Sequence, residues 1–291
     1  MVTRKVGILG YPLIHSISPI FQQAAFDKLE IDIVYKVWEV APEELAQKIR
    51  DLRNENVVGA NVTIPHKETV ISMLDELDCE ASSIGSVNTI VNRSGLLVGY
   101  NTDNFGFTQS LKKNAGFQPN DKKILVIGAG GAARAAIRSL LDEGACSVVI
   151  ANRTVDRARR LAQEFEGEKP IQTMSLTSYE FSENAGNVDL IVNCTSMGMS
   201  NGPSEYCTPL NAQQIPQNVL VYDMVYNPLE TPLIKEARKA GASVMGGLPM
   251  LVYQGAKAFE IWTGCLAPIG MMFEAAEKAL ASNVHSSLDL A

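Results

Sequence analysis

The chain has 291 residues, of which 46% are hydrophobic and 20% charged, and this composition is typical of a globular protein with one large core or two modest ones. Its formal net charge of -7 argues against a sequence-independent nucleic-acid binder, because such proteins displace counterions from phosphates with clustered Lys and Arg. No apolar run approaches the roughly 20 residues that span a bilayer. We therefore expect neither nucleic acid nor a membrane among its partners.

Cysteine and histidine are scarce in this chain. The five cysteines are odd in number and lack the Cys-x-x-Cys spacing, which is typical of reduced thiols in a cytosol. Three histidines offer few ligands for a transition metal. We expect a cytoplasmic protein without a metal site.

The first hundred residues are predicted to alternate between strands and helices, as in an α/β fold with mainly parallel sheets. In chain order, the expected elements are a strand, a helix, two strands, a helix and a β-hairpin, at 5–9, 19–29, 33–39, 57–64, 65–77 and 87–91 with 96–100.

A helix and a polar connection at 104–120 lead to a second module. The expected elements of this module are a buried strand, a glycine-rich turn, a helix, a strand, a polar helix and two more strands, at 123–127, 128–133, 134–143, 147–151, 155–166, 190–194 and 219–224. The final stretch, 250–280, carries apolar residues at helical spacing and is expected to pack on the first module.

The turn after the strand at 123–127 indicates a dinucleotide site. Gly128 and Gly130 allow the backbone to turn tightly and approach a pyrophosphate, and Ala133 is small where the helix meets the strand. The helix N-terminus offers unpaired N–H groups to phosphate oxygens. Such a motif alone is weak, but its position between an apolar strand and a helix strengthens the prediction. The expected contacts are Gly128, Ala129, Gly130, Gly131 and Ala132.

The end of the next strand favours NADP over NAD. An NAD site places an acidic residue there, whereas this chain has amide, hydroxyl and guanidinium donors that suit a 2′-phosphate. The candidates are Asn152, Arg153, Thr154 and Arg157. In the alternative interpretation, Thr154 is only a helix N-cap, Arg157 is solvated, and Asp156 pairs with one of the arginines.

Two serines near the start of the first predicted helix are candidates for binding an anion. Ser18 precedes Pro19, so it also has a purely structural interpretation as an N-cap. Ser16 has no such structural explanation. Because a helix N-terminus with two hydroxyls is a natural seat for a carboxylate, both interpretations of Ser18 can hold together.

The segment 59–67 combines polar side chains with a lysine. The strand period of two places Asn61 and Thr63 on one face, which indicates a ligand crevice at the carboxyl end of the strand. Pro65 is expected to begin a helix, so that Lys67 lies in its first turn, where the helix dipole disfavours an ammonium. Without the polar residues that precede it, Lys67 would be interpreted as an ordinary solvated lysine.

Two further polar residues follow in the hairpin region. Asn88 lies in the first hairpin strand and Asp103 follows the second. Each has a structural alternative, Asn88 as a turn amide and Asp103 as a turn or cap residue.

Taken together, these motifs resemble the shikimate dehydrogenase family along nearly the whole chain, in the order that the family has them. They are His15-Ser-x-Ser-Pro19, Asn61-Val-Thr-Ile-Pro-His-Lys67, Gly85-Ser-Val-Asn-Thr89, Asn101-Thr-Asp103, Gly128-Ala-Gly-Gly-Ala-Ala-Arg-Ala135, Asn152-Arg-Thr154, Tyr226-Asn-Pro-x-x-Thr-Pro-Leu233 and Gly247-Leu-Pro-Met-Leu-Val-Tyr-Gln254.

The resemblance implies roles for individual residues. It implies that Lys67 and Asp103 are the catalytic pair and that Ser16 and Ser18 hold a substrate carboxylate. The residues implied to bind the rest of the substrate are Asn61, Thr63, Asn88, Asp103, Tyr226 and Gln254, and those implied to complete the cofactor site are Met224 and Gly247.

The same resemblance implies two domains, a substrate-binding domain of residues 1–104 and 248–291 and a Rossmann-like NADP-binding domain of residues 105–247. The implied activity is reversible NADPH-dependent reduction of 3-dehydroshikimate to shikimate, in the chorismate route to aromatic amino acids. Two alternatives stay open, a quinate/shikimate dehydrogenase with NAD or dual cofactor use and a non-catalytic NADP-binding regulator. The expected assembly is a monomer or a homodimer.

Overall fold

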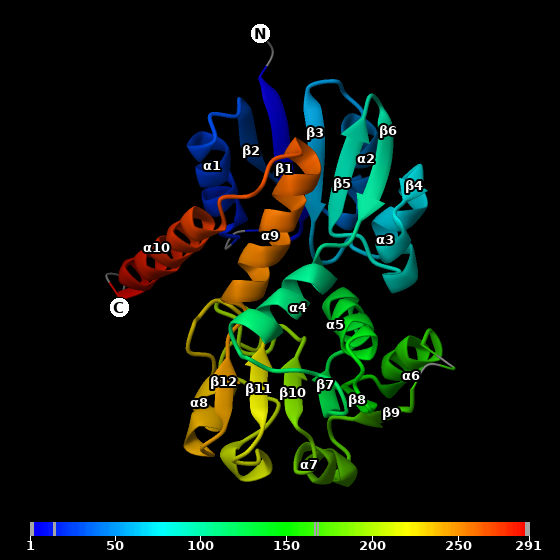
Figure 1. Cartoon of the computed structure of the whole chain (residues 1–291), viewed down its shortest axis with the longest axis vertical. Helices are drawn as coiled ribbons and strands as arrows, with labels where there is room; N and C mark the ends of the chain where they lie inside the picture. Colours follow the sequence, from blue (N-terminus) through cyan, green and yellow to red (C-terminus); the bar gives the residue numbers. More distant parts are fainter. Residues whose placement is uncertain (1–2, 14–15, 166, 168, 289–291) are drawn as a thin grey trace. The chain divides into compact units, whose positions relative to one another are not determined.

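The computed structural model describes residues 3–13, 16–165, 167 and 169–288, and of residues 179 and 283–288 the backbone alone (Figure 1). The chain divides into two compact units, unit 1 (Met1–Gly106 with Leu251–Ala291) and unit 2 (Phe107–Met250). The chain leaves unit 1 within helix α4 (Asp103–Lys113) and returns to it within helix α9 (Leu248–Thr263).

Unit 1 contains a mixed six-stranded sheet with the strand order β2-β1-β3-β5-β6-β4. Strand β1 pairs in parallel with β2 and β3, β5 runs antiparallel to β3 and β6, and β4 is parallel to β6. The strands are β1 Arg4–Gly10, β2 Ile33–Glu39, β3 Val57–Val62, β4 Glu76–Leu77, β5 Thr89–Arg93 and β6 Leu96–Tyr100.

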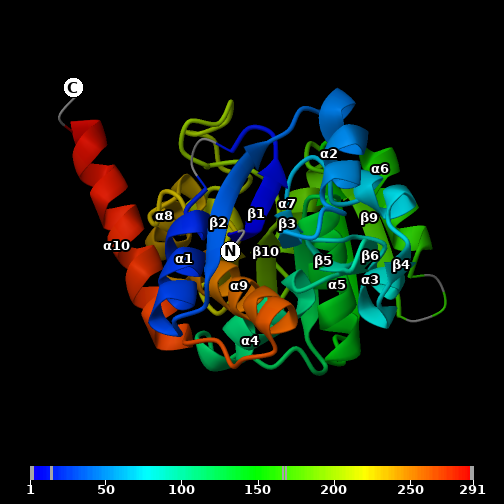
Figure 2. The same ribbon diagram turned by 90° about the horizontal axis from the view of Figure 1, so that it is seen from above.

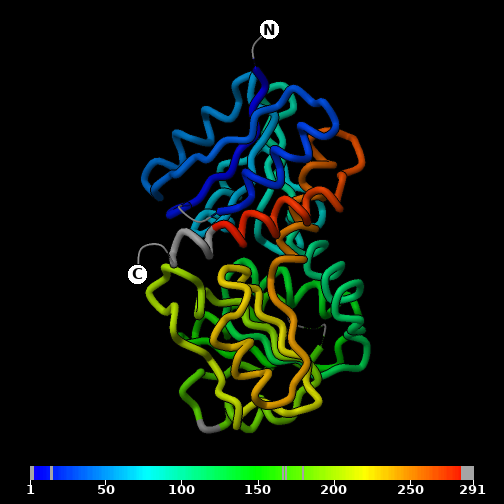
Figure 3. Tube along the Cα trace, turned by 90° about the vertical axis from the view of Figure 1, so that its left-hand side faces the viewer, coloured from blue at the N-terminus to red at the C-terminus, as the bar shows by residue number. Residues whose placement is uncertain are grey.

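The other described elements of unit 1 are helices and 3-10 turns. Besides parts of α4 and α9, they are α1 Ser18–Lys28, η1 Pro42–Glu44, α2 Leu45–Asp51, η2 Thr69–Met73, α3 Cys79–Ile84 and α10 Ile269–Leu288. Helices α1 and α10 lie side by side in Figure 2. In Figure 3 the orange and red C-terminal segments lie beside the blue N-terminal strands.

The C-terminal helices pack on the first module, as their apolar spacing predicted. The rings of Phe26 on α1 and Phe259 on α9 lie 4.9 Å apart, and the Trp262 indole donates to the Ile90 carbonyl at 2.9 Å. In the core, Leu45 and Ile49 of α2, with Leu52 just after the helix, are buried among residues of β1, β3, β5 and β6. These three side chains recur at helical spacing, which is why a short helix has one buried face.

The helix expected over 65–77 is wrong. The chain turns at 64–68, then forms η2 and the short strand β4. The His66 ring is buried and bonds the Val40 carbonyl at 2.7 Å, while the Lys67 carbonyl accepts from the Val87 N–H at 2.9 Å. A tertiary hydrogen bond thus takes the Lys67 carbonyl, which a helix would need for an intrahelical bond. Consequently, Lys67 lies outside any helix and the expected dipole effect on its ammonium does not apply.

Unit 2 contains a fully parallel six-stranded sheet with the order β12-β11-β10-β7-β8-β9. Its elements are β7 Lys123–Ile127, α5 Gly131–Asp142, β8 Ser147–Asn152, α6 Val155–Gln163, β9 Ile171–Ser175, α7 Tyr179–Ala185, β10 Leu190–Asn193, η3 Ala212–Gln214, β11 Leu220–Asp223, α8 Pro232–Lys239 and β12 Ser243–Met245. The expected α/β class with parallel-rich sheets is confirmed.

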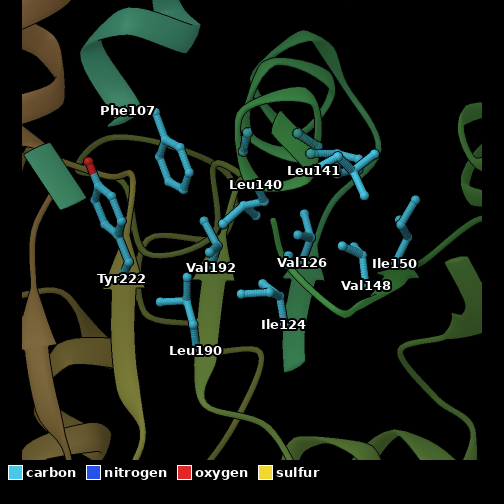
Figure 4. Packing of buried hydrophobic residues seen from close by; sticks show 14 of the residues in the cluster. Phe107, Ile124, Val126, Leu140, Leu141, Val148, Ile150, Leu190, Val192 and Tyr222 are labelled. Carbon is cyan, nitrogen blue, oxygen red and sulfur yellow. The ribbon is translucent and has the colours of Figure 1, made fainter. Parts of the chain in front are cut away.

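Both faces of this sheet are covered, which explains the continuous apolar strands. Along β7, Ile124 and Val126 face the cluster that contains Leu140 of α5, whereas Leu125 and Ile127 belong to the cluster on the opposite face. Figure 4 shows the first cluster, in which Val148, Ile150, Leu190, Val192, Phe107 and Tyr222 complete the packing. The ring of Tyr222 stacks on that of Phe107 with a centroid distance of 5.3 Å.

Two general properties follow from the described residues. None of the helices in the described ranges has both the length and the apolar character required to cross a bilayer. All five cysteines are free thiols.

Candidate active site

The clearest chemical feature of unit 1 is an ion pair between Lys67 and Asp103. The Lys67 Nζ lies 2.5 Å from the Asp103 Oδ2, and the two side chains are 17% and 5% exposed. Lys67 comes from the turn after β3, whereas Asp103 is the first residue of α4. The fold therefore joins two groups that are distant in sequence, and it leaves the lysine in contact with solvent while the carboxylate is almost covered.

A neighbouring asparagine fixes the backbone of Asp103. The Asn101 Oδ1 accepts from the N–H of Asp103 at 2.9 Å, and its Nδ2 donates to the Ser86 carbonyl at 2.8 Å. The Asn101 side chain thus binds an N–H in the first turn of α4 and ties this turn to the chain before β5. The structural alternative for Asp103, that of a turn or cap residue, does not describe its side chain, because the carboxylate accepts from Lys67 and Asn88.

Asn88 is the centre of a buried polar cluster. Its Nδ2 donates to the Asp103 Oδ1 at 2.8 Å and to the Gln254 Oε1 at 3.1 Å, and its Oδ1 accepts from the Thr102 N–H at 2.8 Å. The residue Asn88 as a whole is 2% exposed. The structure therefore brings together Lys67, Asp103, Asn88 and Gln254 from four separate segments, and the turn-amide alternative for Asn88 does not describe it.

The predicted pair Asn61 and Thr63 divides between two environments. Asn61, on β3, is buried, and its Oδ1 accepts from the Tyr35 hydroxyl at 2.7 Å. Strand β3 ends at Val62, two residues earlier than expected, so Thr63 directly follows the strand. Thr63 is partly exposed and its N–H donates to the Leu9 carbonyl at 2.8 Å.

Ser16 and Ser18 lie at the start of α1, but Ser18 is not the N-cap that the sequence predicted. Ile17 occupies the N-cap position, Ser18 is the first helical residue, and no side chain caps this helix. Among the described residues, the hydroxyls of Ser16 and Ser18 make no hydrogen bond to protein groups, which leaves both available to a ligand. His15, which belongs to the same motif, lies outside the described residues.

In unit 2, the glycine turn connects β7 to α5 as the sequence predicted. Gly128 has φ 115°, a backbone conformation that favours glycine, and its N–H donates to the Ala151 carbonyl at 2.8 Å. A Cβ on Gly130 would meet no atom within 4 Å, so the space in front of the helix is open. Helix α5 begins at Gly131, three residues before the expected start, and the small side chain of Ala133 is buried against the sheet.

This turn fits the pyrophosphate of a dinucleotide. The first intrahelical bond of α5 runs from the Arg134 N–H to the Gly130 carbonyl, so the N–H groups of Gly131 and Ala132 have no helical partner. With the open space at Gly130, these donors form a helix N-terminus suited to phosphate oxygens. Ala129 lies in the same turn, partly exposed.

The end of β8 carries exposed cationic and polar side chains. Arg153, Thr154 and Arg157 are exposed, and in the described ranges neither arginine has a carboxylate partner. Asp156 pairs instead with Arg159 at 2.9 Å, so the alternative in which it neutralises Arg153 or Arg157 is wrong. Thr154 does occupy the N-cap position of α6, but its side chain makes no capping hydrogen bond. The Asn152 Nδ2 donates to the Thr154 carbonyl at 2.9 Å and shapes the turn.

Two of the other expected cofactor residues meet in unit 2. A Cβ on Gly247 would lie 2.0 Å from the Met224 carbonyl oxygen, and the Gly247 N–H donates to the Val225 carbonyl at 3.2 Å. Only glycine permits this approach between the chain after β11 and the chain after β12. Tyr226 follows β11 and is partly exposed.

Sequence reasoning missed a second buried polar cluster, around Asp223 at the end of β11. This residue is 0% exposed, and its carboxylate accepts from the Thr231 hydroxyl at 2.6 Å and the Asn193 Nδ2 at 2.9 Å. Burial raises the pKa of Asp223 to about 6, against the opposing effect of these hydrogen bonds. An acid at the carboxyl end of an apolar strand was the available signal. Sequence reasoning also missed Thr89 and Thr102, which hydrogen-bond to Asn88, and Tyr35, which hydrogen-bonds to Asn61.

Comparison with known proteins agrees with this arrangement. Three family models match the chain: "Shikimate dehydrogenase substrate binding domain" at residues 8–90, "Shikimate / quinate 5-dehydrogenase" at 110–224 and "Shikimate 5'-dehydrogenase C-terminal domain" at 247–279. Shikimate dehydrogenase (NADP(+)) of Methanopyrus kandleri is 45% identical over 276 residues, which cover 94% of each chain. The same enzyme of Geobacter metallireducens is 44% identical over 273 residues, which cover 93% of this chain and 94% of the relative.

A solved structure has the same fold. The crystal structure of shikimate 5-dehydrogenase from Thermus thermophilus, in complex with NADP(H) and shikimate, superposes with a TM-score of 0.84 and 37% sequence identity. The match covers 95% of this chain and 100% of that chain. On the strength of the three family models and of relatives above 40% identity over nearly their full length, the chain belongs to the shikimate dehydrogenase family.

Proposed function

We propose that this protein catalyses the reversible NADPH-dependent reduction of 3-dehydroshikimate to shikimate, a step of chorismate and aromatic amino acid biosynthesis. The observation that carries the proposal is the Lys67–Asp103 pair, at 2.5 Å and with a partly exposed ammonium, in a chain of this family. Retention of both groups argues against a non-catalytic regulator. The names of the relatives, which specify NADP(+), favour NADP over NAD.

The chemistry follows from charge that develops on the substrate oxygen. The bound cofactor supplies the hydride. As the carbonyl carbon accepts it, the oxygen becomes an alkoxide, and the Lys67 ammonium stabilises this charge and transfers a proton to it. The Asp103 carboxylate accepts a hydrogen bond from Lys67 and so holds the ammonium in place. In the reverse direction, the Lys67 Nζ accepts the proton that the substrate hydroxyl loses.

The remaining polar groups of unit 1 are assigned to binding the substrate. The hydroxyls of Ser16 and Ser18, at the start of α1, have no protein partner among the described residues and are suited to the carboxylate. The groups assigned to ring hydroxyls are Asn61, Thr63, Asn88, Asp103 and Gln254, with Tyr226 as a further substrate contact. Asn61 and Asn88 already hydrogen-bond to protein groups, so each has limited capacity left for a ligand.

NADP is assigned to unit 2. The turn of Gly128, Ala129, Gly130, Gly131 and Ala132 would receive the pyrophosphate, and Met224 and Gly247 would line the site. The guanidinium groups of Arg153 and Arg157, which have no carboxylate partner in the described part of the chain, would hold the 2′-phosphate together with Asn152 and Thr154.

We extend the proposal to the organisation of the chain. Residues 1–104 with 248–291 form the substrate-binding domain and residues 105–247 the NADP-binding domain, with boundaries close to those of units 1 and 2. A cytoplasmic monomer or homodimer is proposed, consistent with five free thiols.

The decisive test is an assay that follows the absorbance of NADPH or NADH as it forms. The assay offers shikimate and quinate, each with NADP⁺ and with NAD⁺. We expect shikimate with NADP⁺ to give the highest kcat/KM. A higher kcat/KM with quinate and NAD⁺ would support the quinate dehydrogenase alternative. Binding of NADP without turnover of either substrate would support the regulator.

A further inference from the structure

A chain of buried hydrogen bonds runs from β2 to the catalytic carboxylate of unit 1. It begins at the Tyr35 hydroxyl, which donates to the Asn61 Oδ1 at 2.7 Å. The Asn61 Nδ2 donates to the Thr89 Oγ1 at 3.2 Å, and that hydroxyl donates to the Asn88 Oδ1 at 3.1 Å. The Asn88 Nδ2 then donates to the Asp103 Oδ1 at 2.8 Å. Every donor in the series points one step closer to Asp103.

We propose that Tyr35 is a positioning residue for the catalytic pair, acting through Asn61, Thr89 and Asn88 on the Asp103 carboxylate. The proposal rests on the function assigned above and adds to it a residue that does not touch the substrate.

The direction of the series is set at Asn61. A side-chain amide has an acceptor end and a donor end, and its partners decide which end faces which neighbour. The Asn88 carbonyl, which can only accept, takes the Asn61 Nδ2 at 3.3 Å, and the Tyr35 hydroxyl, which burial keeps protonated by raising its pKa, donates to the Asn61 Oδ1. With the Asn61 oxygen directed at Tyr35, its nitrogen must face Thr89. The Thr89 hydroxyl, which accepts from that nitrogen, is then free to donate to Asn88.

The surroundings of Tyr35 support a fixed hydroxyl. Tyr35 is 6% exposed, its N–H donates to the Gln23 Oε1 at 2.8 Å, and its ring lies 6.4 Å from that of Trp262. Gly59 makes room for the indole, since a Cβ there would lie 2.5 Å from the Trp262 Nε1. Thr89 is 0% exposed, so water does not replace the middle link.

The catalytic end of the series explains why orientation matters. The Asp103 Oδ2 receives Lys67, and the Oδ1 receives Asn88, so the second bond sets the rotation of the carboxylate that holds the ammonium. The Thr102 N–H also donates to the Asn88 Oδ1, at 2.8 Å. Asn88 therefore has partial support from another direction, and loss of Tyr35 should weaken the positioning without abolishing it.

The test uses two variants that each break one link, Tyr35→Phe and Thr89→Val, together with the double variant. For each, kcat and KM are measured for shikimate oxidation with NADP⁺. We expect each single variant to lower kcat about threefold to tenfold, the range that one hydrogen bond supports, with KM for NADP⁺ unchanged. Because the links act in series, the double variant should be no slower than the slower single variant. Thr89→Ser, which keeps the hydroxyl, should restore kcat.

The matched control is Tyr222→Phe. Tyr222 is also 0% exposed, and its hydroxyl bonds the Ser110 Oγ at 2.7 Å in unit 2, away from the series. This variant should lose thermal stability to a similar degree as Tyr35→Phe while it keeps its kcat. A Tyr35→Phe enzyme with wild-type kcat, or multiplicative losses in the double variant, would overturn the proposal.

A measurement without substrate separates this inference from the proposed function. In ¹⁵N NMR spectra of the ligand-free protein, Tyr35→Phe should shift the side-chain amide signals of both Asn61 and Asn88, whereas Tyr222→Phe should leave them in place. Unchanged Asn88 signals in Tyr35→Phe would contradict the inference even if the wild-type enzyme reduced some other ketone.

Discussion

At the scale of single residues, the site in unit 1 depends on how few polar atoms are left free. Asn61, Asn88 and Asp103 bond mainly to protein groups, whereas the Lys67 side chain retains exposure and the hydroxyls of Ser16 and Ser18 have no described partner. Preorganised groups of this kind cost little reorganisation when charge develops in the reaction. The residues that remain available are those proposed to hold the carboxylate and to transfer the proton.

Replacing Lys67 removes the proposed acid. We expect Lys67→Ala to lower kcat by a factor of roughly 10² to 10⁴, as loss of a positioned proton donor does, with little change in NADP affinity. Steady-state kinetics and a cofactor titration measure the two effects. Lys239→Ala, which removes an exposed lysine paired with Glu236 in unit 2, serves as control and should behave as wild type. Near-normal turnover in Lys67→Ala would refute the mechanism.

Arg153 determines cofactor choice in this proposal. Because its guanidinium has no described carboxylate partner, we expect Arg153→Ala to weaken NADPH binding roughly 10-fold to 100-fold, the effect of losing a charge-assisted hydrogen bond, and NADH binding only slightly. Fluorescence titration with both cofactors tests this. Arg159→Ala, which removes a neighbour already paired with Asp156, should change neither affinity. Equal losses for both cofactors in Arg153→Ala would exclude a 2′-phosphate contact.

At the scale of elements, strands and their ends place the functional groups. The parallel strands of unit 2 end at one edge of the sheet, where the glycine turn after β7, the cationic turn after β8 and the Asp223 cluster after β11 follow them. In unit 1 the turn after β3 and the start of α4 carry Lys67 and Asp103, the proposed catalytic pair. The wrong prediction of a helix over 65–77 belongs to this scale. The residue types of the segment favour a helix, but the Lys67 carbonyl accepts from the Val87 N–H instead of from a helical partner.

The close approach at Gly247 gives a prediction for the chain between β12 and α9. Because a Cβ at Gly247 would meet the Met224 carbonyl at 2.0 Å, we expect Gly247→Ala to lower the free energy of unfolding by about 1–3 kcal/mol and to weaken NADP binding. Denaturant unfolding and calorimetric titration measure both. At the adjacent Gly246 a Cβ would meet only the Ile234 Cδ1, at 3.7 Å, so Gly246→Ala is the control and should be nearly neutral. Equal effects of the two substitutions would contradict the structure here.

At the scale of the whole molecule, stability comes from apolar cores built around each sheet. Each sheet of the two units buries its strands under helices, and the described cores consist of aliphatic and aromatic side chains. Against this background a buried carboxylate is costly unless donors surround it. Asp223, with Asn193 and Thr231 as partners, is such a group, and it couples global stability to pH.

The sign of this coupling follows from the raised pKa of Asp223. Its folded-state value of about 6 exceeds the reference value of 3.8, so between these values the folded protein binds the proton more strongly. The contribution of Asp223 to the free energy of unfolding should therefore rise as pH falls from 7 to 4, by up to about 3 kcal/mol. Urea unfolding of wild type and Asp223→Asn from pH 8 to 5 tests this. As pH falls, the free energy of unfolding of the wild type should increase relative to that of the variant. A difference between the two that does not change with pH would refute the raised pKa.

The sequence by itself determined the α/β class, the parallel sheet with its glycine turn, and the choice of Lys67 and Asp103 as candidates for a catalytic pair. Strand periodicity and glycine placement are local properties that a single chain displays, and the ordered motifs supported membership of the family. Only the tertiary structure decided that Asn101 accepts from the Asp103 N–H, that Asp156 pairs with Arg159, and that Tyr35 reaches Asn61. These contacts join groups from separate elements, or pair a residue with one of several partners that lie equally near it in the sequence. Their formation depends on packing and burial, which neither residue type nor spacing specifies.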